Sequence, residues 1–379
     1  MTPTELNIPL KLYREGEANF YSTDLDYLER LGISYTRAPV FYNPRMKLNR
    51  DVTISLFSTL SLKTAADLMA ASGVRAIRLV LEGGAEHVIA NDSNYLAAYI
   101  MRKNVELNGL FREIKVKCSD ARLEAERMSW EGERVDYIDL DPFGSPAPYI
   151  DSFLRAVRGG GVIGVTATDT PPLFGIYPDK LHRFYGIWGK KTPFHKEFGI
   201  RSLISFITRV AARLDLLATP ILSYGREHYI RVFFRIRKSP SLSSHAIKTS
   251  LGWVECCNDS WITHKGLEIP ERECSGMLMG PIWLEKISDP ELIGKMDRSL
   301  SDELKVLLDQ LSLESHGPPF YYVLDRICSR LKVRTPKINE VIVKLRERGF
   351  FSSRTHLEPL GVKTNASIKE VEEIIEELS

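Results

Sequence analysis

Asp67-Leu-Met-Ala-Ala-Ser-Gly-Val-Arg75 is the stretch of this sequence that decides its fold. It overlaps an apolar run, Thr64–Leu68, that is typical of a buried strand, and it leads into a helix predicted over Val74–Leu81. A strand that ends in an acid and passes through small residues into a helix lets a ligand approach backbone N–H groups closely. Only Gly73 of this turn is glycine, so the Gly-x-Gly-x-x-Gly pattern is absent and an ordinary strand-to-helix turn stays open as an alternative.

Residues 52–165, which contain this turn, alternate between strand-like and helix-like stretches. Tyr95–Leu107 is amphipathic and is predicted as a second helix. The further predicted strands are His87–Ala90, Ile114–Cys118, Val135–Leu140 and Val162–Thr166. Such alternation predicts an α/β domain with a parallel sheet and helices on both faces. Ala218–Tyr224 and Tyr229–Arg235 flank the polar segment Gly225–His228, and we expect them to complete the sheet with an antiparallel hairpin.

The chain is predicted to divide into a larger domain, residues 1–238, and a smaller α+β domain, residues 246–379, joined by the linker Lys238–His245. The smaller domain ends in a succession of two helices and a β-ribbon, predicted at Tyr321–Leu331, Ile338–Arg348 and Phe350–Lys363. Helix, turn, helix and ribbon in this order form the winged-helix pattern. The segment is locally basic through Lys332, Arg334, Lys337, Lys344, Arg346, Arg348, Arg354 and Lys363.

Composition restricts the function less than the motifs do. The 379 residues carry a net charge of only +2, so any nucleic-acid-binding surface must come from local clustering of basic residues. No apolar run is long enough to cross a membrane, and Met1–Glu17 lacks the apolar core of a signal peptide, so we expect a soluble cytoplasmic protein. The cysteines are odd in number and scattered, which argues against a disulfide framework. They are Cys118, Cys256, Cys257, Cys274 and Cys328.

Acidic residues stand at the ends of four of the predicted strands: Asp67, Asp92, Asp120 and Asp141. The carboxyl ends of parallel strands meet at one edge of a sheet, where ligands bind. Asp92 is placed to accept hydrogen bonds from the ribose hydroxyls of a nucleotide-like cofactor, and Asp120 from an adenine amino group. Each of these two could instead cap the helix that follows it. The four together favour a cofactor site.

The fourth acid belongs to Asp139-Leu-Asp141-Pro142-Phe143-Gly144-Ser145-Pro146, the most specific motif of the chain. An exocyclic amine of a nucleobase is a poor nucleophile because its lone pair is conjugated with the ring. The carboxylate of Asp141 and the carbonyl of Pro142 could accept its two N–H bonds, free the lone pair and stabilise the developing positive charge. Phe143 could stack on a flipped base. The alternatives are a turn residue for Asp141 and a core aromatic for Phe143.

The sequence resembles the archaeal branch of the tRNA guanine-26 N2-dimethyltransferase family over nearly its whole length. Besides the Asp139–Pro146 motif, the resemblance is carried by Glu15-Gly16, Phe41-Tyr-Asn-Pro-Arg-Met-Lys-Leu-Asn-Arg-Asp51, Ser72–Arg78, Asn91-Asp92, Gly164–Asp169, Gly280-Pro-Ile-Trp283 and Thr355-His356. It implies a Rossmann-like class I methyltransferase domain and a tRNA-binding C-terminal domain. The implied reaction transfers one or two methyl groups from S-adenosylmethionine to N2 of guanine 26 in tRNA, without an obligate protein partner.

The resemblance also implies roles for individual residues. The S-adenosylmethionine contacts would fall on Arg50, Arg75, Asp92, Asp120 and Ala121. The target guanine would be held by Asp141, Pro142 and Phe143, with Phe41 as a second aromatic at the border of the base site. Without the resemblance, Arg50 would be interpreted as a surface ion-pair residue and Phe41 as a core residue.

Many relatives carry a zinc site made of paired Cys-x-x-Cys elements, and this chain lacks that pattern. Only Cys256-Cys257 and Cys274 stand in the corresponding region, and this spacing does not provide a tetrahedral site. His264 could be recruited, but an ordinary histidine is the simpler interpretation. We therefore predict no structural metal.

Two other functions stay open on the sequence alone. A DNA amino-methyltransferase would use an Asp-Pro-Pro-Tyr or Asn-Pro-Pro-Tyr turn for the same chemistry, and Asp141-Pro142-Phe143-Gly144 departs from that pattern. A nonenzymatic winged-helix regulator would account for residues 321–363, but it would have no use for acids at four strand ends.

Overall fold

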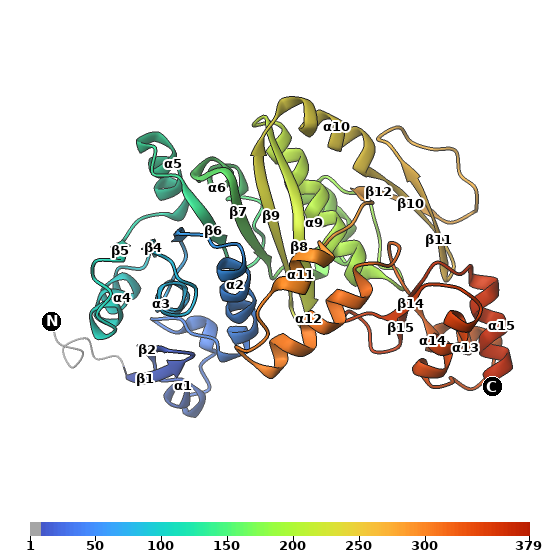
Figure 1. The fold of residues 1–379 in the computed structure, drawn as a ribbon, viewed down its shortest axis with the longest axis horizontal. Helices are drawn as coiled ribbons and strands as arrows, with labels where there is room; N and C mark the ends of the chain where they lie inside the picture. The colour runs from blue at the N-terminus through green and yellow to red at the C-terminus, as the bar shows by residue number, and fades with distance from the viewer. Residues whose placement is uncertain (1–8) are drawn as a thin grey trace. The chain divides into compact units, whose positions relative to one another are not determined.

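The computed structural model describes residues 9–379, and these form two compact units. Unit 1 contains residues 9–142 together with residues 148–165 and 296–305. Unit 2 contains residues 143–147, 166–295 and 306–379. Both are drawn in Figure 1. The units differ from the predicted ranges 1–238 and 246–379, which remain a proposal about how catalysis and RNA binding are divided.

Unit 1 begins with the hairpin of β1 (Leu10–Glu15) and β2 (Ala18–Thr23), followed by α1 (Leu25–Arg30), the short 3-10 turns η2 (Tyr35–Arg37) and η3 (Pro44–Met46), and α2 (Lys47–Thr59). The alternating part follows as β3 (Thr64–Asp67), α3 (Val74–Leu81), β4 (His87–Asn91), α4 (Tyr95–Leu107), β5 (Ile114–Lys117), α5 (Ala121–Glu131), β6 (Val135–Leu140), α6 (Ile150–Ala156) and β7 (Val157–Ala167). Each predicted strand and helix of this region is present, and β7 is longer than predicted.

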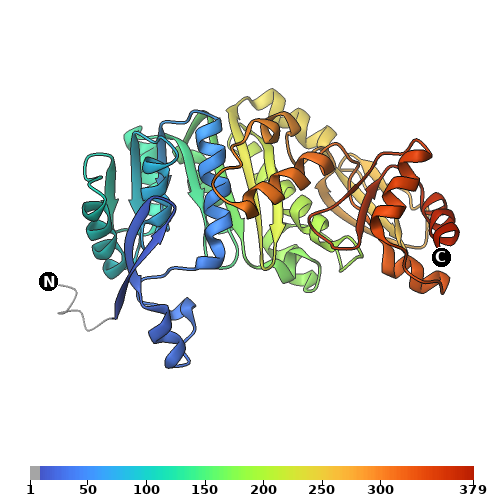
Figure 2. The same ribbon diagram turned by 60° about the horizontal axis from the view of Figure 1, so that its bottom comes forward.

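The parallel strands of unit 1 stand in the order β5-β4-β3-β6-β7. The chain moves from β3 toward one edge through β4 and β5, and from β6 toward the other edge through β7. Since crossovers between parallel strands are right-handed, α3 and α4 cover one face and α5 and α6 the other. α5 packs against α6, and α2 packs against α3; Figure 2 shows α2 in light blue alongside the sheet. The crevice where ligands bind in such sheets lies at the carboxyl ends of β3 and β6.

Unit 2 begins with the turn at Phe143–Ala147 and continues after Val165 with α7 (Thr170–Leu173), α8 (Pro178–Tyr185), α9 (His195–Ala212), β8 (Leu216–Arg226), β9 (Tyr229–Lys238), α10 (Pro240–Ser250), β10 (Leu251–Cys257), β11 (Ser260–Lys265), β12 (Met277–Trp283) and α11 (Pro290–Lys295). β8 and β9 pair antiparallel, so the predicted hairpin is confirmed. β10 pairs antiparallel with both β11 and β12.

The predicted linker Lys238–His245 is wrong, because most of it is helical. Ser239 caps α10 through its side chain, which accepts a hydrogen bond from the N–H of Leu242, and Pro240 occupies the first turn. A serine cap followed by proline is a helix start, since the fixed φ of proline suits the first turn and its missing N–H would have no partner there.

The last part of the chain contains α12 (Asp302–Glu314), β13 (Tyr322–Val323), α13 (Leu324–Leu331), α14 (Ile338–Glu347), β14 (Ser352–Arg354), β15 (Gly361–Thr364) and α15 (Ile368–Leu378). The predicted helices and ribbon are present, but the first helix begins at Leu324 instead of Tyr321, because Tyr322 and Val323 pair with β15 as a strand. α15 was not predicted, and the winged-helix classification stays a prediction. Apolar residues of α13, α14 and α15 form one buried core with Val362 of β15. This core is tied to α9 by Lys363, whose Nζ donates to Glu197 at 2.8 Å.

One disulfide bond was not expected from the cysteine pattern. It joins Cys257, at the end of β10, to Cys274, in the connection before β12, with the two Cα atoms 6.3 Å apart. The antiparallel pairing of β10 with β12 brings these residues together, and sequence spacing alone does not reveal such an approach.

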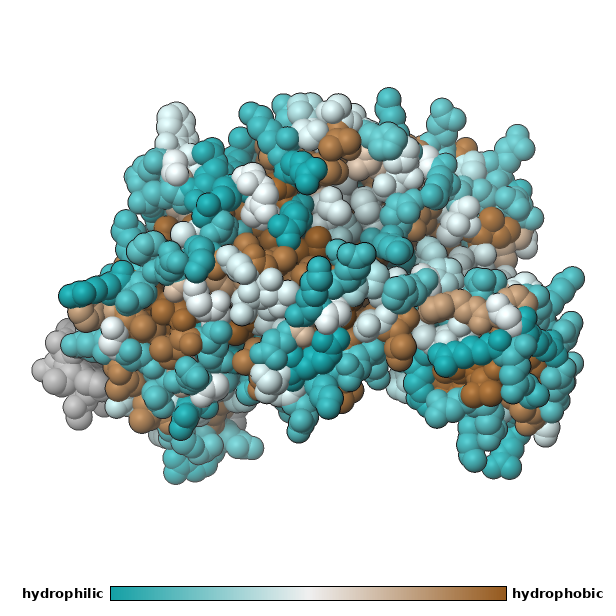
Figure 3. Space-filling view, viewed as in Figure 1, coloured by the Kyte–Doolittle hydropathy of each residue, from teal (hydrophilic) through white to brown (hydrophobic). Residues whose placement is uncertain are grey.

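The described helices include none with the length and apolar character that a bilayer crossing requires. Hydrophilic residues dominate the face seen in Figure 3, and apolar residues appear there in separate patches.

Candidate active site

The crevice between β3 and β6 contains a buried ion cluster centred on Arg75. Asp67, the last residue of β3, stands opposite Asp139 of β6 in the parallel register. Arg75 extends from the first turn of α3, where its guanidinium contacts the carboxylates of Asp139 at 2.5 Å and Asp67 at 3.8 Å. It also pairs with Asp141, just beyond the end of β6. Tyr137 donates its hydroxyl hydrogen bond to Asp139 and completes the cluster.

Asp141 is the member of this cluster that faces outward. Its side chain is 19% exposed, whereas that of Asp139 is fully buried. Burial raises the pKa of the Asp67 carboxyl, and the charges of Asp139 and Asp141 add to the rise although Arg75 opposes it. Even with a proton on Asp67, two carboxylates share one guanidinium, so the crevice is negative. A negative crevice stabilises positive charge that develops during a reaction.

The turn after Pro142 is held by residues of unit 2. The Gly144 N–H donates to the Thr168 hydroxyl at 2.6 Å, and the Thr168 N–H donates back to the Gly144 carbonyl at 3.0 Å. The Ser145 hydroxyl lies 2.7 Å from the hydroxyl of Tyr185, a residue of α8. Phe143 is 70% exposed on this fixed turn, which rules out the alternative that it is a core aromatic. Pro142 itself is buried.

Asp92 follows β4 and is half-buried. Its carboxylate accepts from the N–H of Ala71 at 2.9 Å and from that of Asn94 at 2.8 Å. The first contact ties the end of β4 to the turn after β3, in which Gly73 adopts φ +80°. The cap of α4 is Asn94, whose side chain accepts from Leu96, so the alternative interpretation of Asp92 as the helix cap does not hold.

Asp120 behaves differently. It is the N-cap of α5, and its side chain accepts from the N–H groups of Arg122 and Leu123. The alternative role considered for it is therefore present in the structure. Since 42% of the carboxylate remains exposed, a second hydrogen bond to a ligand is still sterically open. Ala121 opens α5 and is buried.

Arg50 lies in a second buried ion cluster, and this excludes its interpretation as a surface residue. Its guanidinium pairs with Glu15 of β1 at 2.5 Å and donates to the carbonyl of Asn43 at 3.1 Å. Glu15 also pairs with Arg78 of α3 at 2.8 Å. The cluster fixes the N-terminal segment on α3. Phe41 lies just before Asn43 in the sequence. Its side chain is half-buried, and the centroid of its ring lies 6.2 Å from that of Tyr35.

Several contacts within these clusters were missed at the level of sequence. The acids Asp67 and Asp141 were singled out, but nothing in their spacing reveals that Arg75 joins them or that Tyr137 supports Asp139. The Gly164–Asp169 block was noted without a role. In the structure its Asp169 accepts from the Tyr185 hydroxyl at 2.8 Å, so this block supports the turn that carries Phe143.

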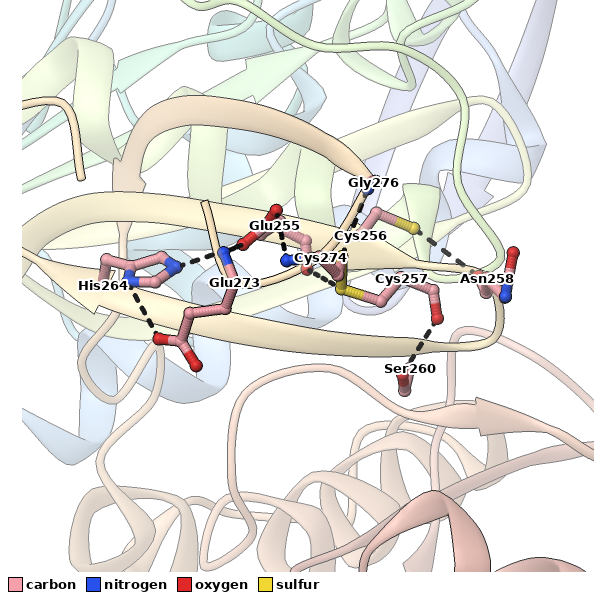
Figure 4. The surroundings of a disulfide bond; sticks show 9 residues. All are labelled: Glu255, Cys256, Cys257, Asn258, Ser260, His264, Glu273, Cys274 and Gly276. Carbon is pink, nitrogen blue, oxygen red and sulfur yellow. Dashed lines mark hydrogen bonds and ion pairs between the residues drawn. A yellow bond between two sulfur atoms is a disulfide. The ribbon is translucent and has the colours of Figure 1, made fainter. Parts of the chain in front are cut away.

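The thiols of unit 2 form a separate candidate cluster, drawn in Figure 4. Ligand atoms of Glu255, Cys257 and Cys274 lie within 4.8 Å of one another, and the two cysteines are joined as a disulfide. The sulfur of Cys256 points away from this bond, toward the carbonyl of Asn258. Glu255 accepts from the backbone N–H groups of Glu273 and Cys274, which occupies the carboxylate.

A parallel sheet with acids at the carboxyl ends of β3, β4 and β6 defines a Rossmann-like α/β domain of the kind that binds nucleotide-like cofactors. The sequence profile described as "N2,N2-dimethylguanosine tRNA methyltransferase" matches residues 16–376, and the chain belongs to this family. The resemblance seen in the sequence is thereby confirmed.

Known relatives match the sequence of this chain along most of its length. The tRNA (guanine(26)-N(2))-dimethyltransferase of Methanopyrus kandleri is 34% identical, with 98% of this chain and 97% of that protein covered. That of Pyrococcus horikoshii is 36% identical over 87% and 90%. The structure of Trm1 from Pyrococcus horikoshii in complex with S-adenosyl-L-methionine has a TM-score of 0.86 and 32% sequence identity, and covers 97% of this chain and 100% of that chain.

Proposed function

We propose that this protein is a tRNA (guanine(26)-N(2))-dimethyltransferase that transfers one or two methyl groups from S-adenosylmethionine to N2 of guanine 26. The observation that carries this proposal is Asp141, fixed by Arg75 in the crevice of β3 and β6 and followed directly by Pro142 and the exposed Phe143. Membership of the N2,N2-dimethylguanosine tRNA methyltransferase family supports tRNA as the substrate. Since that substrate is tRNA, we also propose the cytoplasm as the compartment.

The residues of unit 1 fit S-adenosylmethionine. A sulfonium cation suits the negative crevice around Arg75, and the half-buried carboxylate of Asp92 suits ribose hydroxyls. We assign Arg50, Arg75, Asp92, Asp120 and Ala121 to this site, with Arg50 and Arg75 acting through the carboxylates they hold. When bound, S-adenosylmethionine supplies an electrophilic methyl group.

The protein's own contribution is to bind and orient the amine. Asp141 and the carbonyl of Pro142 accept its N–H bonds, and Phe143 stacks on the base with Phe41 at the border of the site. Arg75 keeps the carboxylate of Asp141 in one orientation, because a guanidinium shared with Asp139 cannot rotate freely. Orientation of this kind removes much of the entropic cost of reaction.

The proposal is tested with a tRNA transcript, a matched transcript in which guanine 26 is adenine, and duplex DNA. Mass spectrometry of the nucleosides should show N2-methylated or N2,N2-dimethylated guanosine in the first substrate only. Methylation of DNA, or methylation of both transcripts alike, would contradict the proposal.

Asp92→Ala is expected to weaken S-adenosylmethionine binding by roughly 1.5 to 3 kcal/mol, the usual worth of hydrogen bonds to a charged group. Isothermal titration calorimetry measures the change. Asn94→Ala is the matched control, because it removes the cap of α4 while leaving Asp92 in place. It should lower the melting temperature and leave the cofactor dissociation constant unchanged. If Asp92→Ala also kept the wild-type cofactor affinity, Asp92 would serve only the turn at Ala71.

Elemental analysis of the purified protein is expected to give well under one zinc per chain, and a chelator should leave activity unchanged. The reason is the ligand set: Glu255, Cys257 and Cys274 provide three ligands instead of four, and two of them are joined to each other. The measurement is made on reduced and on untreated protein. Stoichiometric zinc that disappears in Cys274→Ser would establish a metal site here.

A further inference from the structure

The sequence offers the basic residues near the C-terminus as candidates for holding RNA, and the structure pairs several of them with acids. Lys344 lies 3.1 Å from Glu347, and Arg348 lies 3.1 Å from Glu373 of α15. Arg348 also contacts Glu377 of the same helix. The unpredicted helix α15 therefore places glutamates beside part of this basic group and lowers its local potential.

A different segment of unit 2 carries basic residues without such partners. Residues 176–191, which contain α8, include four Lys or Arg and a single Asp. Within residues 9–379, none of these four side chains forms an ion pair with a carboxylate: Lys180, Arg183, Lys190 and Lys191. Unpaired cations on a surface attract phosphate groups.

Exposed aromatic rings lie among these cations. Tyr177 is 58% exposed and Trp188 56% exposed, and the Trp188 ring stacks on His182 with centroids 3.7 Å apart. Lys180 and Arg183 both lie over the ring of Phe184, at 5.5 and 5.3 Å from its centroid. Interleaved cations and exposed rings are what proteins use to bind unstacked RNA bases and the backbone that joins them.

The segment is held in one shape by contacts at its base. Trp188 exchanges two backbone hydrogen bonds of 2.8 Å with Gly280. Gly175 approaches the backbone of Lys190 so closely that a Cβ atom would lie 2.4 Å from its carbonyl carbon. Its rings and cations are therefore preorganised, which lowers the entropic cost of binding.

Residues 176–191 also contact the turn that carries Phe143. Tyr185, the last residue of α8, contacts the Ser145 hydroxyl at 2.7 Å, and its carbonyl accepts from Arg209 at 2.5 Å. An RNA strand whose base stacks on Phe143 would have its neighbouring nucleotides beside this turn.

We propose that residues 176–191 form the surface that binds the RNA strand flanking the target guanine, with Lys180, Arg183, Lys190 and Lys191 on phosphates and Tyr177 and Trp188 on bases. The proposal rests on the proposed function and names the part of the protein that holds the substrate.

The charge of this surface is tested with the double variant Lys190→Ala/Lys191→Ala. Its dissociation constant for tRNA should rise at least tenfold at moderate salt, and the slope of log K against log salt should fall by roughly 1.4 to 1.8, the value for two phosphate contacts. The KM for tRNA should rise in parallel, while kcat at saturating tRNA and cofactor affinity stay within twofold. Lys238→Ala/Lys248→Ala, which removes two exposed lysines elsewhere in unit 2, is the control and should change tRNA affinity by less than twofold.

The stacking role is tested with Trp188→Ala, which should raise the tRNA dissociation constant about five- to 150-fold, and with Trp188→Phe, which should restore most of the affinity. Melting temperatures verify that the variants are folded. Wild-type affinity and salt slope in all these variants would overturn the inference. Wild-type protein that binds tRNA but does not methylate guanine 26 would instead refute the proposed function and leave this surface as an RNA-binding site.

Discussion

Asp141→Ala is expected to lower the rate of methyl transfer at saturating substrates by at least about a hundredfold, the usual effect of removing an acceptor directed at transition-state charge. Asp141 is the partly exposed acid of the Arg75 cluster, so it is the carboxylate that an amine can reach. Arg75 keeps its contact of 2.5 Å with Asp139 in this variant, so the crevice should remain formed. Single-turnover methylation assays measure the rate.

Asp141→Asn separates charge from shape. It keeps an oxygen acceptor of similar size and loses the negative charge, so a rate between wild type and Asp141→Ala would apportion the effect between the two. Cofactor affinity should fall much less than the rate in either variant, because Asp139 keeps its charge beside Arg75 and Asp141 is the acid of the cluster that faces outward. Near-wild-type turnover in Asp141→Ala would exclude the assigned role.

The fold was predictable where local sequence and tertiary packing agree. The bounds of α3, α4 and β6 match the prediction because apolar periodicity and the small-residue turn before Val74 indicate the same elements that burial requires. The linker prediction failed at Ser239-Pro240, where a serine cap and a first-turn proline favour a helix over an irregular segment.

The candidate site was predictable only in part. Parallel strands bring Asp67, Asp92 and Asp141 to one edge of a sheet whatever their partners are, so the acids could be located from the strand pattern. Their ion pairs could not, because Arg75 meets Asp141 across 66 residues and Arg50 meets Glu15 across 35. Long-range contacts of this kind depend on helix placement and are not encoded in spacing.

The attachment of the C-terminal elements to α9 makes the stability of unit 2 sensitive to acid. Glu197 is fully buried, and its carboxylate accepts from Lys363 at 2.8 Å, Arg201 at 2.7 Å and the N–H of Phe320 at 2.8 Å. Burial alone would raise the pKa of this carboxyl, but Lys363, Arg201 and these hydrogen bonds outweigh burial and lower it from 4.5 to about 2.

A lowered pKa in the folded state means that Glu197 stabilises the fold above its unfolded pKa of 4.5, and that this contribution is lost as the pH falls toward about 2. The shift corresponds to about 3 kcal/mol of unfolding free energy at neutral pH.

Glu197→Gln is expected to cost roughly 3 to 5 kcal/mol at pH 7, because it leaves Lys363 and Arg201 buried without their counter-charge. The cost should shrink steadily as the pH is lowered from 5 to 3. Urea unfolding of wild type and variant across this range measures it, and Glu340→Gln, at an exposed pair with Lys337, is the control that should follow the wild-type curve. Parallel curves for wild type and Glu197→Gln between pH 3 and 7 would mean that Glu197 does not link the C-terminal elements to α9 through its charge.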